Sequence, residues 1–255
     1  MSNHYVRYQR IGDTARITLT HAKRHNALVP TLLDDLLNAL ENCRQDPPRV
    51  LVLDAEGASF SSGGDVRAFF TTARSERVDY AKAVVGRLNR TILTLLELPC
   101  PTIAAVQGLV TGGSLGLVLA SDVVVASTRA TFAPWYTVVG FSPDGGWSNL
   151  MGQRIGPSRA LEIQLTNRTI TAQQALDYGL AHYLADHDAF PGKVADISDI
   201  LCHRQPGSVR HTLTLNRPDL TQTAAQLQRE YEHFLAQITT DEAHLGMAKF
   251  LERAP

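Results

Sequence analysis

The sequence has few cysteines, no excess of either charge and no long apolar run. The three cysteines, Cys43, Cys100 and Cys202, lie far apart among 255 residues. This pattern excludes a disulfide framework or a cysteine zinc site and favours a reducing compartment. A net charge of −1 provides no global basic field for nucleic acid or a membrane surface. Because residues 1–10 contain no signal core and no apolar run is long enough to span a membrane, we expect a soluble, cytoplasmic protein.

Nucleotide-binding and metal-binding motifs are also missing. The chain has neither a P-loop nor a G-x-G-x-x-G motif after a strand. Its nine histidines show no metal-ligand spacing. His21 and His25 are four residues apart, but Pro30 and the apolar segment before them argue against a helix there. We therefore expect no metal and no separate cofactor.

The residues that are present predict an α/β fold. Apolar residues make up 44% of the chain and charged residues 19%, as in globular domains. Alternation on both sides of Gly12-Asp13 predicts a hairpin over residues 5–19. Short apolar runs then alternate with segments of helical spacing. Such alternation predicts a parallel sheet with helical crossovers, with strands at 49–54, 102–106 and 122–126 and helices at 32–40, 78–98 and 113–120.

The pattern becomes mainly helical after Pro143. Residues 147–165 and 171–180 are each predicted to form a helix, and residues 181–185 a last strand. Helical patterns then continue to the end of the chain. We therefore predict a core over residues 1–190 and a helical C-terminal region over residues 191–255.

Two glycine-rich segments follow predicted strands. Gly63 and Gly64 are adjacent, and they either bring backbone N–H groups close to a ligand or form an ordinary turn. The second segment contains Gly112-x-Ser114-x-Gly116, which matches the nucleophile elbow of serine hydrolases. The alternative is a helix beginning near Gly113, whose free N–H groups would face an anion or a polarised carbonyl. In that interpretation Ser114 is a small residue at the helix start.

A carboxylate and a basic loop are the other candidates. Asp144 lies among apolar residues, which raise the pKa of a carboxyl group and make it a useful base. The competing interpretation, which is the commoner case, is that Asp144 caps a helix starting at Gly145. The loop His21–Leu28 carries basic side chains, which either bind a phosphate or remain solvated.

Taken together and in order, these segments resemble the crotonase, or enoyl-CoA hydratase/isomerase, superfamily. The resemblance covers nearly the whole chain, and it rests on the order and spacing of motifs that are weak singly: Asn26-Ala-Leu28, Phe60-Ser-Ser-Gly-Gly-Asp65, Ala104-Ala-Val-Gln-Gly108, Gly112-Gly-Ser-Leu-Gly116 and Gly140-Phe-Ser-Pro-Asp-Gly-Gly146. It implies a spiral core of ββα turns with a helical C-terminal trimerisation region, hence a homotrimer or hexamer. It also argues against Ser114 as a hydrolase nucleophile.

The resemblance further implies an acyl-CoA thioester substrate and an oxyanion hole. The backbone N–H groups of Gly64 and Gly113 would stabilise the negative charge that develops on the thioester oxygen. CoA is then part of the substrate and not a separate cofactor. In relatives, CoA is contacted at the positions of Lys23, Arg24, Asp65, Phe250 and Arg253. The last two positions often reach the nucleotide from a neighbouring subunit.

The acid–base residues select among the reactions of the superfamily. Hydratases use two glutamates, and their positions fall here on Gly116 and Tyr136, neither of which does carboxylate chemistry. Asp144 instead aligns with an aspartate that shuttles a proton in isomerase relatives. We therefore expect conversion of a 3-enoyl-CoA to a 2-enoyl-CoA, with Asp144 as acid and base. Tyr136 is expected to hydrogen-bond within the pocket or to form its wall.

Three alternatives remain open. Asp144 and the aromatic residues near it also resemble 4-chlorobenzoyl-CoA dehalogenases, but their histidine falls on Asn89 and their tryptophan on Tyr136. Acyl-CoA hydrolases of the superfamily keep the aspartate and normally have a glutamate at the position of Tyr136. The third alternative is a protein that binds acyl-CoA without catalysis.

Overall fold

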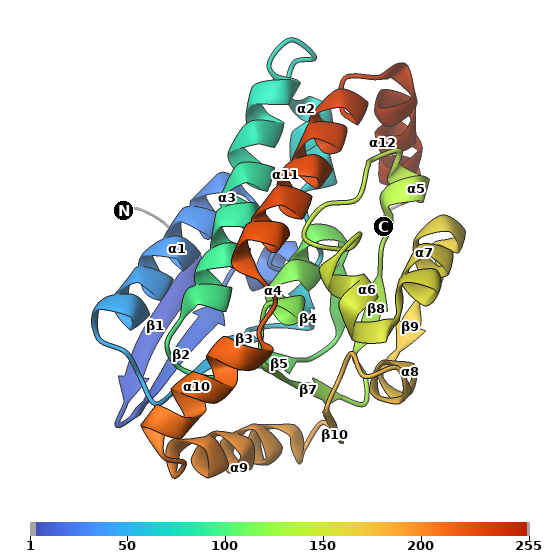
Figure 1. Cartoon of the computed structure of the whole chain (residues 1–255). Helices are drawn as coiled ribbons and strands as arrows, with labels where there is room; N and C mark the ends of the chain where they lie inside the picture. The colour runs from blue at the N-terminus through green and yellow to red at the C-terminus, as the bar shows by residue number, and fades with distance from the viewer. Residues whose placement is uncertain (1–3, 254–255) are drawn as a thin grey trace.

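Two β-sheets form the centre of the molecule in the computed structural model, which describes residues 4–253 apart from the side chain of Arg253 (Figure 1). In the larger sheet β1 and β2 are antiparallel, and every other neighbouring pair is parallel. Its strand order is β1-β2-β3-β5-β7-β10: Val6–Ile11, Thr14–Leu19, Val50–Ala55, Thr102–Val106, Val123–Ser127 and Tyr183–Ala185. The predicted hairpin and the α/β class are thereby confirmed.

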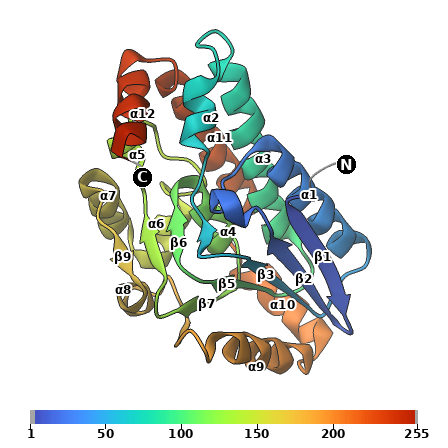
Figure 2. The ribbon, with the colours of Figure 1, turned by 180° about the vertical axis from the view of Figure 1, so that it is seen from behind.

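The central strands bury side chains on both of their faces, which explains their uninterrupted apolar sequences. In β3, Leu51 and Leu53 join the main core, whereas Val50 and Val52 join a smaller cluster on the other side. Helix α9 (Phe190–Cys202) covers this smaller cluster with Val194. The large sheet therefore lies between α9 and the helices of the main core, such as α1 (Pro30–Gln45), and Figure 2 shows this arrangement from behind.

A second sheet lies beside the first. Its order is β4-β6-β8-β9: Ser59–Ser61, Leu109–Thr111, Thr131–Ala133 and Ile170–Thr171. Strands β4, β6 and β8 follow β3, β5 and β7 respectively, so each turn of the chain adds one strand to each sheet. This is the ββα spiral that the resemblance implied, although the sequence patterns did not predict these short strands.

The two long helices of the first half of the chain, α1 (Pro30–Gln45) and α3 (Arg77–Glu97), have apolar faces with the expected spacing. The shorter helices and the 3-10 turns (η) of this half are η1 Ala22–Arg24, α2 Val66–Thr71, η2 Gly112–Ser114 and α4 Leu115–Leu119. Pro30 begins α1, where its missing N–H costs nothing. The helix predicted near Gly113 begins as a 3-10 turn at Gly112, and its α-helical part starts at Leu115.

The second half differs most from the prediction between residues 147 and 165. The single helix predicted over residues 147–165 is wrong, because Gly156 with φ +90° and Pro157 separate α6 from α7. The helices here are α5 Tyr136–Val139, α6 Leu150–Ile155, α7 Pro157–Thr166, α8 Ala172–Asp177, α10 Pro206–Asn216, α11 Leu220–Gln237 and α12 Asp241–Arg253. No helix among residues 4–253 is long and apolar enough to cross a membrane.

The last two helices return to the core. Helix α11 packs along α3, and α12 packs against α2 and α5, as Figures 1 and 2 both show. Gly140 and Gly246 allow α12 to approach the end of α5 closely, since a Cβ on either would contact backbone of the other segment. The division of the chain at residue 190 and the trimerisation role of the C-terminal helices remain predictions.

Candidate active site

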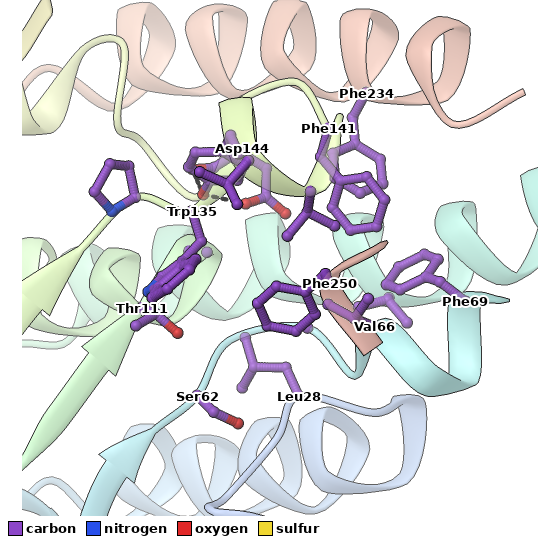
Figure 3. A pocket seen from close by; sticks show the side chains of 18 of the residues that line it. Leu28, Ser62, Val66, Phe69, Thr111, Trp135, Phe141, Asp144, Phe234 and Phe250 are labelled. Carbon is purple, nitrogen blue, oxygen red and sulfur yellow. Dashed lines mark hydrogen bonds between the residues drawn. The ribbon is translucent and has the colours of Figure 1, made fainter. Parts of the chain in front are cut away.

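A pocket of about 630 Å³ lies among α2, α3, α5, α11 and α12 (Figure 3). Most of its wall is apolar and includes Val66, Phe69, Val138, Val139, Phe141 and Phe234. Three of the aromatic rings contact one another, with centroid separations of 5.3 to 5.8 Å. Asp144 is the single acidic residue among the described residues that line the pocket. The site is thus a hydrocarbon-lined cavity with one carboxyl group.

The two glycines predicted to form an oxyanion hole both line this pocket. Gly64 follows β4 and pairs with Leu28 through an isolated parallel bridge. Gly113 is in the first turn of η2, where backbone N–H groups have no partner within the helix. Two chain segments far apart in sequence therefore bring backbone amides to one cavity.

Asp144 lies directly beside Gly113. A Cβ built on Gly113 would be 2.6 Å from Asp144 Oδ1 and 3.0 Å from Oδ2. Only a glycine at position 113 leaves room for the carboxyl group in this place. The predicted base and one predicted oxyanion donor are therefore immediate neighbours. No helix begins at Gly145, since α6 starts at Leu150, so the interpretation of Asp144 as a helix cap is wrong.

The environment of Asp144 favours a carboxyl group that titrates near neutrality. The side chain is 6% exposed. Burial raises its pKa from 3.8 to about 7; the hydrogen bond from Tyr136 lowers this pKa, and the charge of Glu230 raises it. Tyr136 Oη donates to Asp144 Oδ1 at 2.6 Å. Burial and the nearby Asp144 raise the pKa of Tyr136 well above 10, so the phenol keeps its proton and acts as a donor.

The position of the first hydratase glutamate has no room for a side chain. A Cβ on Gly116 would be 2.5 Å from the Gly145 carbonyl oxygen and 2.5 Å from Ile92 Cδ1. Gly145 in turn has φ +66°, and a Cβ there would be 2.5 Å from the carbonyl oxygen of Gly113. The turn after Asp144 and the segment Gly113–Gly116 thus pack backbone against backbone.

Ser114 is not placed as a nucleophile. Its side chain is fully buried, and Oγ donates to the carbonyl oxygens of Thr111 at 2.7 Å and Ser61 at 3.1 Å. The hydroxyl therefore joins the two glycine-bearing segments. The structure removes the serine-hydrolase interpretation on geometric grounds.

The predicted CoA-binding residues are distributed differently. Phe250 lines the pocket, where its ring meets Trp135 edge-on at 5.6 Å between centroids. Lys23 and Arg24 lie in exposed η1. Asp65 pairs with Arg24 at 2.7 Å and also caps α2 by accepting from the Ala68 N–H. Asp65 therefore has a structural partner on each side. The side chain of Arg253 lies outside the described residues.

Three functional candidates were missed by the motif analysis. Lys249 and Phe234 line the pocket, and Glu230 hydrogen-bonds to the turn that follows Asp144. The sequence did contain a signal that could have identified Glu230. This residue stands between Leu227 and Phe234 on the buried face of an amphipathic helix. A carboxylate at such a position needs partners, and this marks it as unusual.

Asn89 does not face the pocket as a catalytic group would. Its Nδ2 donates to the carbonyl oxygen of Leu227 on α11 at 3.1 Å. Its neighbour Leu88 lines the pocket instead. Asn89 therefore joins α3 to α11, and it takes no part in lining the cavity.

Comparisons with known proteins agree with this architecture. The chain is 32% identical over 198 residues to 4-chlorobenzoyl coenzyme A dehalogenase-2 of Arthrobacter, covering 77% of this chain and 72% of that protein. It is 26% identical to trans-2-decenoyl-[acyl-carrier-protein] isomerase of Streptococcus mutans, covering 80% and 77%.

Solved structures superpose closely. The enoyl-CoA hydratase of Bacillus halodurans matches with a TM-score of 0.90 at 24% identity, over 96% of this chain and 99% of that one, which shows the shared fold. An enoyl-CoA hydratase of Mycobacterium avium subsp. paratuberculosis matches with a TM-score of 0.87 at 26% identity, over 98% and 96%. The enoyl-CoA hydratase/isomerase family model matches residues 11–255. The chain belongs to the enoyl-CoA hydratase/isomerase family, also called the crotonase superfamily.

Proposed function

We propose that this member of an acyl-CoA enzyme family isomerises a 3-enoyl-CoA to a 2-enoyl-CoA, with Asp144 as both acid and base. The observation that carries the proposal is the single buried carboxyl group beside Gly113, in a pocket with no second acidic residue among the described lining residues. One carboxylate suffices for a 1,3-proton shift when the substrate is held on one face. Hydration uses two glutamates in relatives, and the structure has no space for one at Gly116.

The reaction balances with the residues present. Asp144 takes a proton from C2, and the electron pair delocalises onto the thioester oxygen as a dienolate. The N–H groups of Gly64 and Gly113 stabilise that oxygen as its charge develops. Protonated Asp144 then returns the proton to C4, which re-forms the carbonyl and leaves the double bond between C2 and C3. Tyr136 holds Oδ1, so Oδ2 is the atom that we assign to proton transfer.

CoA enters as part of the substrate, without a separate cofactor, and its nucleotide contacts Lys23, Arg24, Asp65, Phe250 and Arg253. The apolar wall of the pocket favours an acyl group without polar substituents. We further propose a homotrimer or hexamer in the cytoplasm, which light scattering of the purified protein and fractionation of cells would test.

The first experiment mixes purified protein with 3-enoyl-CoA thioesters of several chain lengths and follows the absorbance of the conjugated product. Asp144→Asn should lower kcat by about 10²–10⁴-fold, because general acid–base catalysis contributes about that much. Its acyl-CoA affinity, measured by calorimetry, should remain. Asp177→Asn, at an exposed position of α8, is the matched control and should retain activity. Normal turnover by Asp144→Asn would exclude this mechanism.

The Arthrobacter relatives favour a second candidate, in which the Asp144 carboxylate attacks the ring of an aromatic acyl-CoA. Two observations weaken it. The residue at the position of the dehalogenase histidine, Asn89, is bonded to α11, and Tyr136 replaces the tryptophan. Chloride release from 4-chlorobenzoyl-CoA, measured in the same assay series, separates the two candidates.

A further inference from the structure

Helix α11 carries a carboxylate on its buried face. Thr223, Leu227, Glu230 and Phe234 are the buried residues of this helix and follow one another at helical spacing. Glu230 is 5% exposed. Burying an ionised carboxylate is costly unless donors satisfy its oxygens. Glu230 therefore needs hydrogen-bond donors for its carboxylate oxygens.

All three donors come from the turn directly after Asp144. Glu230 Oε2 accepts from the Gly146 N–H at 2.7 Å. Oε1 accepts from the Ser148 N–H at 2.8 Å and from Ser148 Oγ at 2.6 Å. These donors favour the charged form of the carboxylate, although burial raises the pKa of Glu230. One side chain of a distant helix thus fixes the residues two and four places beyond Asp144.

The turn that Glu230 holds, residues 145–148, has little freedom to adopt another backbone conformation. Gly145 and Gly146 both have positive φ, at +66° and +86°. Gly145 packs against the backbone of Gly113 at distances that would not admit a Cβ. The Asp144 carboxyl group lies at the end of this turn, between Gly113 and the Tyr136 hydroxyl. A displacement of the turn therefore moves the carboxyl group relative to the oxyanion site.

We propose that Glu230 is a positioning residue of the reaction, which holds the Asp144 carboxyl group in register with Gly113 through its hydrogen bonds to Gly146 and Ser148. This inference rests on the proposed function, in which Asp144 transfers the proton. Glu230 does not line the pocket, so its hydrogen bonds act on the reaction through the turn and not by touching the substrate. A misplacement of about 1 Å at a reacting group costs on the order of 10²-fold in rate, so the clamp has a measurable effect.

Glu230 has a second, electrostatic effect on Asp144. Two titratable groups act on Asp144 from the described elements packed against it, Tyr136 on α5 and Glu230 on α11. The tyrosine donates a hydrogen bond and lowers the pKa of Asp144, whereas the charge of Glu230 raises it. Removal of that charge lowers the pKa of Asp144. The low-pH limb of the kcat–pH profile (the acid limb), where Asp144 becomes protonated and can no longer act as a base, then moves to lower pH.

The test compares Glu230→Gln with Glu232→Gln, an exposed glutamate on the same helix. In Glu230→Gln the amide NH₂ faces the Gly146 N–H or the Ser148 donors, so the clamp loses at least one bond. We expect kcat to fall by about 10²-fold with KM within about threefold, and the acid limb to shift to lower pH. Glu232→Gln should match the wild type in all three. An unchanged kcat and pH profile in Glu230→Gln would overturn the inference.

A milder variant covers the case in which Glu230→Gln does not fold. Ser148→Ala removes the Oγ donor and leaves both backbone bonds and the charge of Glu230 in place. It should lower kcat by roughly threefold to tenfold, since one of the bonds that fix the turn is lost, without moving the acid limb. A shift of the acid limb in Ser148→Ala, or wild-type kcat, would contradict the proposed role.

A measurement without turnover separates this inference from the proposed function. The infrared band of the protonated Asp144 carboxyl group, assigned with Asp144→Asn, can be followed across pH in the free protein. Glu230→Gln should titrate Asp144 at lower pH even if the wild type shifts no double bond. In that outcome the electrostatic coupling of Glu230 to Asp144 holds and the isomerase proposal fails. An unchanged Asp144 titration in Glu230→Gln would overturn that coupling whatever the reaction, whereas the positioning role is decided by kcat.

Discussion

The pocket has two walls of opposite character. The chemical wall consists of Gly64, Gly113, Tyr136 and Asp144, and it is positioned by close backbone contacts and a few hydrogen bonds. The apolar wall, which includes Val66, Phe69, Phe141 and Phe234, consists of packed side chains. The comparison teaches that the proposed turnover would depend on a few fixed atoms, whereas affinity would be spread over many replaceable apolar side chains. Substitutions in the chemical wall should therefore change kcat, and those in the apolar wall should change KM.

The largest effect is expected at Gly113. In Gly113→Ala the Cβ would be 2.6 Å from both Asp144 Oδ1 and Leu88 Cδ2, so it displaces the proposed base or the proposed oxyanion donor. We expect kcat to fall by about 10²–10³-fold, the usual effect of losing one oxyanion donor. Gly86→Ala is the matched control, because its Cβ meets Tyr231 at an ordinary 3.8 Å. Equal activities of the two variants would contradict the division into walls.

Restoring the hydratase glutamates should fail. Gly116→Glu combined with Tyr136→Glu forces a side chain against the Gly145 carbonyl oxygen, which is 2.5 Å from the Cβ position. Overpacking costs about 1–3 kcal/mol, so we expect lower stability and no hydration of 2-enoyl-CoA. Loss of the 2-enoyl absorbance and thermal unfolding are the measurements. Efficient hydration by this double variant would show that the turn after Asp144 moves freely. Tyr136→Phe controls for loss of the hydroxyl alone.

The chemical wall should also carry a cost in stability that depends on pH. The pKa of Asp144 is raised from 3.8 to about 7, so the folded protein binds this proton more tightly than the unfolded chain does. The contribution of this proton to the free energy of unfolding is fully present below pH 3.8 and is lost as pH rises through about 7. Asp144→Asn cannot ionise, so its free energy of unfolding should exceed that of the wild type by about 4 kcal/mol at pH 8, because each pKa unit corresponds to about 1.4 kcal/mol. Denaturant unfolding at several pH values measures this difference, which should shrink towards pH 4.

The smallest effect is expected in the apolar wall. Phe141→Leu keeps an apolar side chain but removes ring contacts with Phe69 and Phe234. We expect KM for the longer acyl chains to rise by about fivefold with kcat nearly unchanged, since apolar burial contributes about 25 cal/mol per Å². Steady-state kinetics over the chain-length series give the split. Leu165→Ala, at an exposed position of α7, is the control. A fall in kcat without a change in KM would assign Phe141 to the chemical wall.

The large sheet and the long helices were predictable because their patterns extend over many residues. Leu32, Leu33 and Leu36 mark the buried face of α1 in the sequence itself. The second sheet was not predictable in this way, because strands of two or three residues show no alternation. These short strands form because the spiral places them side by side, which is information from tertiary packing.

The residues of the candidate site were likewise only partly predictable from the sequence. Asp144 and both glycine segments stand out in the sequence, and the structure places them in one cavity. The close approach of Gly145 to Gly113 and Gly116 depends on how distant segments pack, so no local pattern reveals it. Glu230 is the intermediate case, because its buried position follows from the spacing of α11, whereas its partners in the turn do not.

The contribution of α11 and α12 to the pocket has a consequence for biosynthesis. Phe234, Lys249 and Phe250 complete a cavity whose other lining residues begin at Leu28. Because the N-terminal part of a chain leaves the ribosome first, the segments that contain Gly64 and Gly113 are made well before the helices that enclose them. A nascent chain that has folded both sheets therefore still lacks a closed cavity for its ligand. Ligand binding should stabilise the released protein but not the ribosome-bound intermediate that ends before α11.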